Sequence, residues 1–350
     1  MRALRGPVVL LDAWVPRGAH SNYVPTTPAE LASLGPEFIV LGHAHFDHGA
    51  DAVPIAQASG TTLVGTAEHC QDLKGRAEGG PAVTCVDATP AGAPPGTTRD
   101  VPLVKGLQAT VVKHVHSGAE SPDGPHLPVL PQPSTTSVEH PVAPADLVEF
   151  LAHLPDAEGG TLLWRFRLGG FTMVWHDSSG PLPEKAPGVL DQLRALGPVD
   201  VELGAIQGFD QFTNGMRDPM LYLDAIHADT FVPTHMDDWA PPVSTHASYY
   251  RPYFESAVGE LPPDRRPRHV IFPLDPADYV KPGLLDFDAR LDPLRVTRVC
   301  RDGRLKVRLR GDRADVTSVR ITRSRRRVRA VVTDYDGVRH RLSRTRPRCG

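Results

Sequence analysis

The sequence has 350 residues, of which 40% are hydrophobic and 23% charged, as in an ordinary soluble globular protein. No apolar run approaches the roughly 20 residues of a membrane helix, so we expect no membrane insertion. The formal net charge is −3, but it is unevenly distributed. Residues 295–350 contain 19 Lys and Arg against 5 Asp and Glu, whereas the rest contains 19 against 36. This asymmetry predicts a separate basic module at the C-terminal end.

The first elements predict an α/β domain. Val8–Leu11 is typical of a strand, and Asp12 breaks this apolar run too early for a signal peptide or an anchor. Thr27 caps a short helix that we expect to end at Gly35. The apolar run Phe38–Leu41 then predicts a short buried strand.

Three histidines and an aspartate follow this strand directly: His43, His45, Asp47 and His48. A tight turn that leaves a sheet can direct the first two side chains to one point and the last two to a second. Imidazole and carboxylate groups suit zinc, and iron or manganese is possible at the position with more carboxylate. The sequence therefore predicts two adjacent metal ions.

Further helices and strands alternate up to the next histidines. We expect helices over 51–59 and 66–73, closed by Gly60 and Gly75, with a strand over 62–64 between them. A strand over 107–112 leads to His114 and His116, and spacing alone does not choose between these two as a ligand. The Pro-, Ser- and Gly-rich segment 118–144 predicts either a substrate lid or a disordered linker.

Two more candidate ligands stand at strand ends. After a helix over 145–154, the sequence predicts a hairpin of strands 162–168 and 171–175 that leads to Asp177. Helices over 189–196 and 219–226, a strand over 199–203 and a strand that ends on His235 complete the pattern.

His43-Ala44-His45-Phe46-Asp47-His48 resembles the HxHxDH signature of the metallo-β-lactamase superfamily. The resemblance spans roughly Val8 to Leu285 and implies a four-layer αβ/βα sandwich, mostly found in dinuclear metal hydrolases. Its members usually carry two strands before the one equivalent to Val8–Leu11. A truncated or mis-assigned start, which would also remove an export signal, is therefore open.

The resemblance also assigns roles to individual residues. One metal would be held by His43, His45 and His116, and the other by Asp47, His48 and His235, with Asp177 as a bridge and Asp12 orienting the ligands. His116 is preferred over His114 because the third histidine of the family usually stands at the extreme end of its strand. Asp47, which would also orient the hydroxide, and His116 are the predicted catalytic residues.

The implied function is dinuclear hydrolysis of a small-molecule ester, lactone or phosphodiester by a metal-bridging hydroxide, with two zinc ions as cofactors. One alternative is an iron-dependent oxidoreductase of the same fold. Another is a binding protein in which the metal only stabilises the structure.

The four cysteines suggest a location. Cys70 with Cys85 and Cys300 with Cys349 form two local pairs, which predicts two disulfides and an extracellular or cell-surface protein. Four reduced thiols in a cytoplasmic enzyme are the alternative. The oligomeric state is open.

Alternating residues predict the structure of the basic module. Arg304–Arg310 alternates charged with apolar side chains, and the region 325–332 repeats this pattern. We therefore divide the chain into a metal hydrolase domain, residues 1–288, and an antiparallel β module, residues 289–350, for which an immunoglobulin-like fold is one candidate. Its arginines could bind an anionic polymer or cell surface, or simply cover the solvent-exposed face of a sheet.

Overall fold

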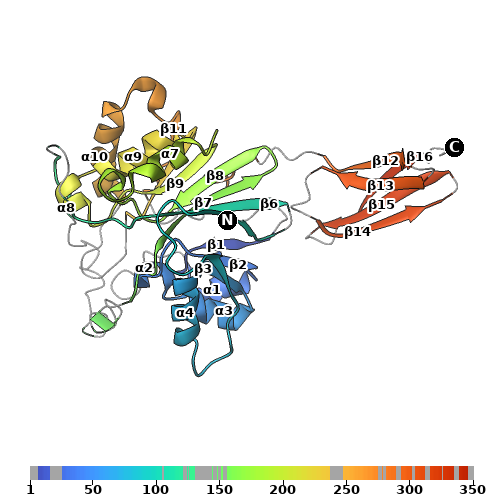
Figure 1. Cartoon of the computed structure of the whole chain (residues 1–350), viewed down its shortest axis with the longest axis horizontal. Coiled ribbons are helices and arrows are strands. Elements are labelled where there is room, and N and C mark those ends of the chain that lie inside the picture. Colours follow the sequence, from blue (N-terminus) through green and yellow to red (C-terminus); the bar gives the residue numbers. More distant parts are fainter. Residues whose placement is uncertain are drawn as a thin grey trace.

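A computed structural model gives the structure of the chain and describes residues 7–15, 26–104, 106–120, 126–130, 156–236, 247–274, 281–288, 293–301, 304–311, 316–324, 326–334 and 339–345, with a few further positions between them. Two β-sheets lie face to face in the larger part, and helices cover both outer sides (Figure 1). No described helix is long and apolar enough to cross a lipid bilayer.

The smaller sheet contains four parallel strands in sequential order. These are β1 (Val9–Leu11), β2 (Phe38–Val40), β3 (Thr62–Thr66) and β4 (Cys85–Thr89). Because all four run in the same direction, their carboxyl ends meet at one edge. The predicted metal loop leaves the sheet at that edge, directly after β2.

The larger sheet contains seven strands and is mixed. In chain order they are β5 (Thr98–Pro102), β6 (Leu107–His114), β7 (Thr161–Leu168), β8 (Phe171–His176), β9 (Val201–Ala205), β10 (Thr230–Thr234) and β11 (His269–Val270). The first four pair antiparallel, and β8 to β11 pair parallel. The predicted hairpin is confirmed as β7 and β8.

Alternating side chains explain why each sheet is covered on both sides. On β7, Leu162 and Trp164 enter the core between the two sheets, whereas Leu163 enters the core beneath the outer helices. On β2, Val40 faces the inner core and Ile39 the outer one. Strands that are buried on both faces read as continuous apolar runs, as these do.

Helices form the two outer layers. The smaller sheet is covered by α1 (Pro28–Ser33), α3 (Ala52–Ser59) and α4 (Ala67–Arg76), and the larger one by α6 (Leu182–Lys185), α7 (Pro187–Arg194), α9 (Arg217–Ile226) and α10 (Ala247–Glu260). The predicted αβ/βα sandwich is therefore confirmed. The Thr27 side chain accepts a hydrogen bond from Glu30 N at 3.2 Å, as its capping role predicts. The expected end of α4 at Gly75 is wrong, because the helix continues to Arg76.

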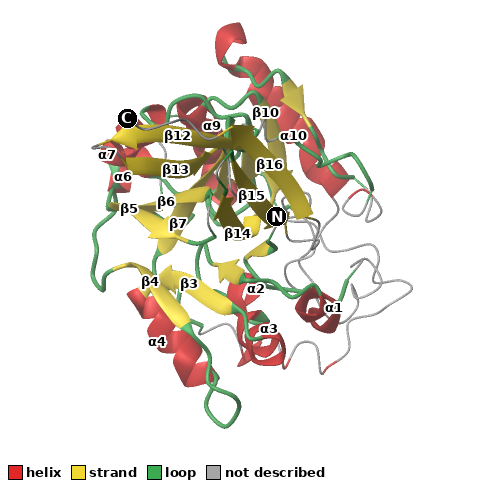
Figure 2. Cartoon of the chain, turned by 90° about the vertical axis from the view of Figure 1, so that its right-hand side faces the viewer, coloured by secondary structure: helices red, strands yellow, loops and turns green. Residues whose placement is uncertain are grey.

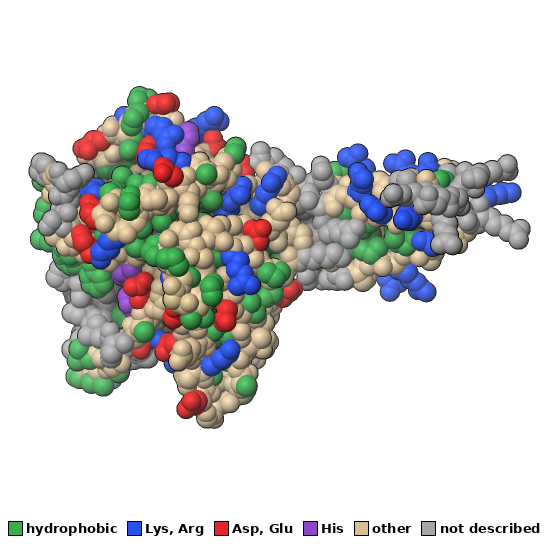
Figure 3. Space-filling model, in the orientation of Figure 1, with side chains coloured by type: hydrophobic (Ala, Val, Ile, Leu, Met, Phe, Trp, Pro, Cys, Tyr) green, Lys and Arg blue, Asp and Glu red, His purple; other side chains and the backbone are tan. Residues whose placement is uncertain are grey.

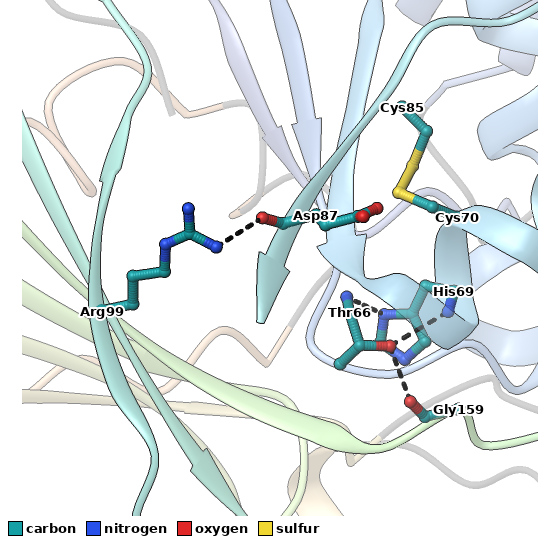
Figure 4. Close-up of a disulfide and its surroundings, with 7 residues drawn as sticks. All are labelled: Thr66, His69, Cys70, Cys85, Asp87, Arg99 and Gly159. Atoms are coloured by element: carbon teal, nitrogen blue, oxygen red, sulfur yellow. Dashed lines mark hydrogen bonds between the residues drawn. A yellow bond between two sulfur atoms is a disulfide. The ribbon is translucent and has the colours of Figure 1, made fainter. Parts of the chain in front are cut away.

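One predicted disulfide joins α4 to β4. Cys70 and Cys85 are bonded, with their Cα atoms 5.4 Å apart (Figure 4). Thr66 caps the same helix and accepts a hydrogen bond from His69 N at 3.0 Å. The second predicted pair is not described, because Cys349 lies outside the described residues. The predicted helix over 145–154 and the predicted lid fall largely outside them too.

The C-terminal part is all β, as predicted. A two-stranded sheet contains β12 (Arg295–Arg301) and β13 (Arg304–Arg310), and a three-stranded sheet contains β14 (Val316–Arg323), β15 (Arg327–Asp334) and β16 (Arg339–Thr345). All neighbouring strands pair antiparallel. Figure 2 shows these sheets in front of the sandwich. The boundary at residue 288 and the immunoglobulin-like fold stay predictions.

Candidate metal centre

Backbone and side-chain contacts fix the loop that follows β2. Leu162 N donates to Gly42 O at 2.7 Å, and Gly42 N donates to Asp12 Oδ1 at 2.9 Å. A Cβ atom at Gly42 would lie 2.0 Å from Cγ of Asp177, so only glycine fits here. The loop therefore reaches the short helix α2 (Phe46–Gly49) in a defined conformation.

The structure brings together the three histidines of the predicted first site. His43, His45 and His116 can each place a ring nitrogen within 4.8 Å of the others. Their ring centroids lie 4.6 to 4.8 Å apart, in edge-to-face orientation. His116 lies two residues beyond the end of β6, where it is free of sheet pairing.

His114 faces a different environment from His116. It is 2% exposed, and its Nδ1 lies 2.8 Å from the hydroxyl of Tyr222, which comes from α9. Burial lowers the pKa of His114 to about 3. Its ring belongs to the packing between the large sheet and its helices, so the choice of His116 agrees with the geometry.

The residues of the predicted second site also lie close together, and His43 lies among them. His43, Asp47 and His48 form a second group of potential ligands within 4.8 Å of one another. His235 follows β10, and its Nε2 lies 3.1 Å from Oδ2 of Asp47. Its ring stacks on that of His48 with centroids 4.9 Å apart. His235 has a φ of +53°, an uncommon conformation for a residue with a side chain.

Two buried carboxylates lie behind the imidazoles. Oδ2 of Asp12 lies 2.6 Å from Nδ1 of His48, and Oδ2 of Asp177 lies 2.6 Å from Nδ1 of His43. The same atom of Asp177 lies 3.3 Å from Nδ1 of His48. Asp12 thus occupies its predicted orienting position. It also adopts a φ of +54°.

Asp177, the predicted bridge, lies on the Nδ1 side of two histidine rings and forms a third group of potential ligands with Asp12 and His48. Asp177 follows the end of β8 directly, and its carboxylate packs against the backbone of Gly42. It therefore contacts the Nδ1 atoms of His43 and His48, whereas Asp47 lies near Nε2 of His48, at 3.4 Å. The next residue, Ser178, uses its hydroxyl to accept a hydrogen bond from Ser117 N.

Four of the predicted histidine ligands share one hydrogen-bonding pattern. Nδ1 of each lies within hydrogen-bond distance of an oxygen: Asp177 for His43, Asp12 for His48, the Ser117 carbonyl for His116 and the Gln207 carbonyl for His235. An imidazole that donates through Nδ1 presents Nε2 as a lone pair, which is how metal-binding histidines are usually oriented.

The charges of the site suit metal binding. Burial lowers the pKa of His43, His45 and His116, the last to about 4, so these rings are neutral. Burial alone would raise the pKa of Asp47, but attraction to His48 and a hydrogen bond with His235 outweigh it and hold that pKa well below its usual value. Burial also opposes the charged form of His48, yet Asp47, Asp12 and Asp177 together raise its pKa. Its ring is therefore protonated without a metal, and a metal ion would replace this proton.

The residues present fit a transition metal. Nε2 of His48 is buried and makes no hydrogen bond of good geometry in the described structure, although Oδ2 of Asp47 lies 3.4 Å away. A buried polar atom that is poorly hydrogen-bonded is costly, and a metal ion bound by both side chains would satisfy it. Neutral imidazoles and an ionised carboxylate are the donors that zinc binds.

Sequence reasoning missed two features around this centre. Phe209 lies in the loop after β9, 51% exposed, with its ring 6.1 Å from that of His116. Beneath the site, His176 Nε2 lies 3.0 Å from a carboxylate oxygen of the fully buried Glu202. The sequence offers a signal only for Phe209, since a glycine-containing turn after a strand often carries functional residues.

The candidate ligands follow strand ends that meet at one edge of two facing sheets. Their order along the chain decides the fold. The chain has the metallo-β-lactamase fold.

No family model matches the sequence. Two curated relatives are described as UPF0173 metal-dependent hydrolases. The protein of Pyrobaculum neutrophilum is 40% identical over 68 residues, 19% of this chain and 28% of the relative. The protein of Polynucleobacter asymbioticus is 29% identical over 164 residues, 46% and 49% of the two chains.

The chain thus spans about half or less of the length of these relatives. Among solved structures, the metallo-β-lactamase fold protein YhfI of Bacillus subtilis is 14% identical, with a TM-score of 0.41 over 76% of this chain and 84% of the other. Zn²⁺-bound PqqB of Methylobacterium extorquens is 12% identical, with a TM-score of 0.41 over 73% of this chain and 81% of the other.

Proposed function

We propose that this chain is a metal-dependent hydrolase that uses two transition-metal ions, preferably zinc, to cleave a carboxylic ester or lactone. The shared Nδ1 hydrogen bonding of His43, His48, His116 and His235 carries the proposal, because a histidine held through Nδ1 can bind a metal ion through Nε2. The curated relatives are named as metal-dependent hydrolases, which supports this reaction class.

Two groups of residues would hold the ions. His43, His45 and His116 form the first, and Asp47, His48 and His235 form the second. Bound there, the ions would supply a water molecule of lowered pKa and Lewis acidity for the developing negative charge. The all-imidazole group favours zinc, and the group that contains Asp47 also suits iron or manganese.

Asp47 would orient the attacking water. Its low pKa keeps it ionised at neutral pH, so it can accept a hydrogen bond from that water. His235 and His48 both lie within 3.4 Å of its Oδ2 and limit how the carboxylate can turn. No serine or cysteine nucleophile is required.

The surroundings of the site favour an uncharged substrate over a phosphodiester. After burial, the largest influences on the pKa of His45 and of His116 come from carboxylates such as Glu158 and from other histidines. Arg76 donates to the metal loop at Ala44 O, but it also pairs with Asp72 and Asp156, which offset its charge. A phosphodiester would instead require cations to stabilise its negative charge. Phe209, in the loop after β9, and Phe212, in the short helix α8 (Gln211–Asn214), are 51% and 42% exposed and offer apolar surface. An ester or lactone with an apolar substituent fits these features best.

A substrate screen of the metal-loaded protein tests the proposal. The expected result is hydrolysis of p-nitrophenyl esters and simple lactones, with much slower turnover of bis(p-nitrophenyl) phosphate. His116→Ala and Asp47→Ala should abolish hydrolysis, whereas the exposed control Leu34→Ala should retain it. Preferred turnover of the phosphodiester would contradict the assigned bond. Iron without zinc and no hydrolysis of any substrate would support an oxidoreductase instead.

A further inference from the structure

The two C-terminal sheets pack through one apolar core, which leaves their opposite faces outward. Val296 and Leu309 come from the two-stranded sheet, and Val328, Ala330 and Val332 come from β15 of the three-stranded sheet. All five are buried. Because side chains alternate along a strand, the residues between these core positions must face away from the core.

Arginines occupy the outward face of the three-stranded sheet. This arginine face consists of Arg320, Arg327, Arg329, Arg339 and Arg341, all exposed. The strand register places Val331 between Arg320 and Arg341, and Arg329 between Thr322 and Ser343. Same-face residues are about 6.7 Å apart along a strand, and neighbouring strands are about 4.8 Å apart. The result is a flat array of cations, and Figure 3 shows Lys and Arg side chains gathered over this part of the chain.

No carboxylate stands at the described strand positions that share this face with the array. The positions that share its face are Ser318, Thr322, Val331, Thr333, Ser343 and Thr345. On the other sheet, Arg295 pairs directly with Arg310. Like charges directly opposite each other destabilise a sheet, and bound anions would remove this cost.

We propose that the arginine face binds an anionic polysaccharide that carries sulfate or carboxylate groups. The planar guanidinium group binds such oxyanions through two parallel hydrogen bonds, and a row of them matches a polymer with repeated charges. Nucleic acid fits less well, because the described residues of the module include no Phe, Trp or Tyr on which bases could stack. The Cys70–Cys85 disulfide is typical of oxidising compartments, where such polysaccharides occur.

The arginine face would anchor the protein rather than select its substrate. The module lies beyond the β7–β8 turn, whereas the metal centre lies at the opposite end of the sandwich, near α2 (Figure 1). Hydrolysis of small substrates should therefore not depend on the arginines. This independence separates the present proposal from the proposed hydrolase function.

Binding of the full chain to heparin tests the proposal. The variant Arg320→Gln/Arg329→Gln/Arg341→Gln should bind heparin at least about tenfold more weakly at low salt, with a shallower salt dependence, because three ionic contacts are lost. The control Lys74→Gln/Arg167→Gln/Lys281→Gln removes three exposed cations from the main domain and should bind as the unmodified chain does. Both variants should keep their metal content.

Further probes give the proposal additional ways to fail. Heparin should raise the thermal midpoint of the unmodified chain, since a ligand of the folded state stabilises it. Polygalacturonate would show whether carboxylate suffices or sulfate is required. The triple Arg→Lys variant keeps the charge and should bind with intermediate affinity. Equal losses in the Gln variant and its control, no thermal shift, or tighter binding of duplex DNA than of either polysaccharide would overturn the proposal.

Discussion

Oδ2 of Asp177 lies 2.6 Å from Nδ1 of His43, on the side of the ring opposite to Nε2. Asp177 is 3% exposed, and its carboxylate fills the space in which a side chain at position 42 would lie. We therefore expect it to position His43 and His48 rather than to bind metal itself. Such a partner of a ligand fixes the ring orientation and raises its basicity.

Asp177→Asn tests this role. Asparagine can still accept the hydrogen bond from His43, so the variant should bind the full number of metal ions, with affinity lowered about 10- to 100-fold. The absorption spectrum of the cobalt-substituted variant should keep its band positions. By contrast, Asp47→Asn removes a proposed ligand and should change both stoichiometry and spectrum. Loss of a metal ion in Asp177→Asn would show that Asp177 is a ligand.

The two neighbouring histidines should differ sharply. His116→Ala removes one of three imidazoles from the first group and should abolish turnover and lower metal content. His114→Phe should retain metal, because His114 contacts Tyr222 instead of the cluster. Metal analysis of both variants by mass spectrometry makes the comparison. The reverse result would assign the ligand to His114.

Phe209 should contribute to substrate selection. Its ring lies beside His116 and is half exposed, so it can pack against the apolar part of an ester. Phe209→Ala should lower kcat/KM for p-nitrophenyl octanoate by roughly threefold to tenfold, with little effect on the acetate. Leu34→Ala, similarly exposed on α1, is the matched control. An equal loss for both esters would indicate a structural effect instead.

Asp210 should make stability depend on pH. Burial, together with Asp218, raises the pKa of Asp210 well above its usual value. Its ionised form is therefore unfavourable in the folded state and lowers the free energy of unfolding. This loss is absent below the unfolded pKa of about 4 and builds up as the pH rises through the folded pKa. Asp210→Asn removes this cost. Its free energy of unfolding, relative to that of the unmodified chain, should therefore be higher at pH 7 than at pH 4 by about 1 kcal/mol or more. Denaturant unfolding at both pH values measures this difference, and the same ΔΔG at both would refute it.

Local patterns were enough to predict much of the fold. The apolar run before His43, the Thr27 cap and the β7–β8 hairpin each depend on neighbouring residues, and each is confirmed. The order of the candidate ligands could be read in the same way, because each stands at a strand end. The strands β4 and β5 were missed, since exposed charged residues interrupt their apolar pattern.

Long-range contacts could not be read from the sequence. The direction of the Asp177 carboxylate depends on its approach to Gly42, 135 positions earlier in the chain. The contact between His176 and Glu202 requires the pairing of β8 with β9. Likewise, only the folded chain shows that His114 points towards α9 whereas His116 joins the cluster.

Metal titration of the metal-free protein tests the central claim most directly. Ester hydrolysis should be absent after chelation. With added zinc it should rise to a plateau at about two equivalents of zinc per chain, as a two-metal hydrolase requires. His48→Ala and His235→Ala should each bind about one equivalent and lose activity. Hydrolysis that persists without metal, or two bound equivalents without hydrolysis of any ester or lactone, would contradict the account.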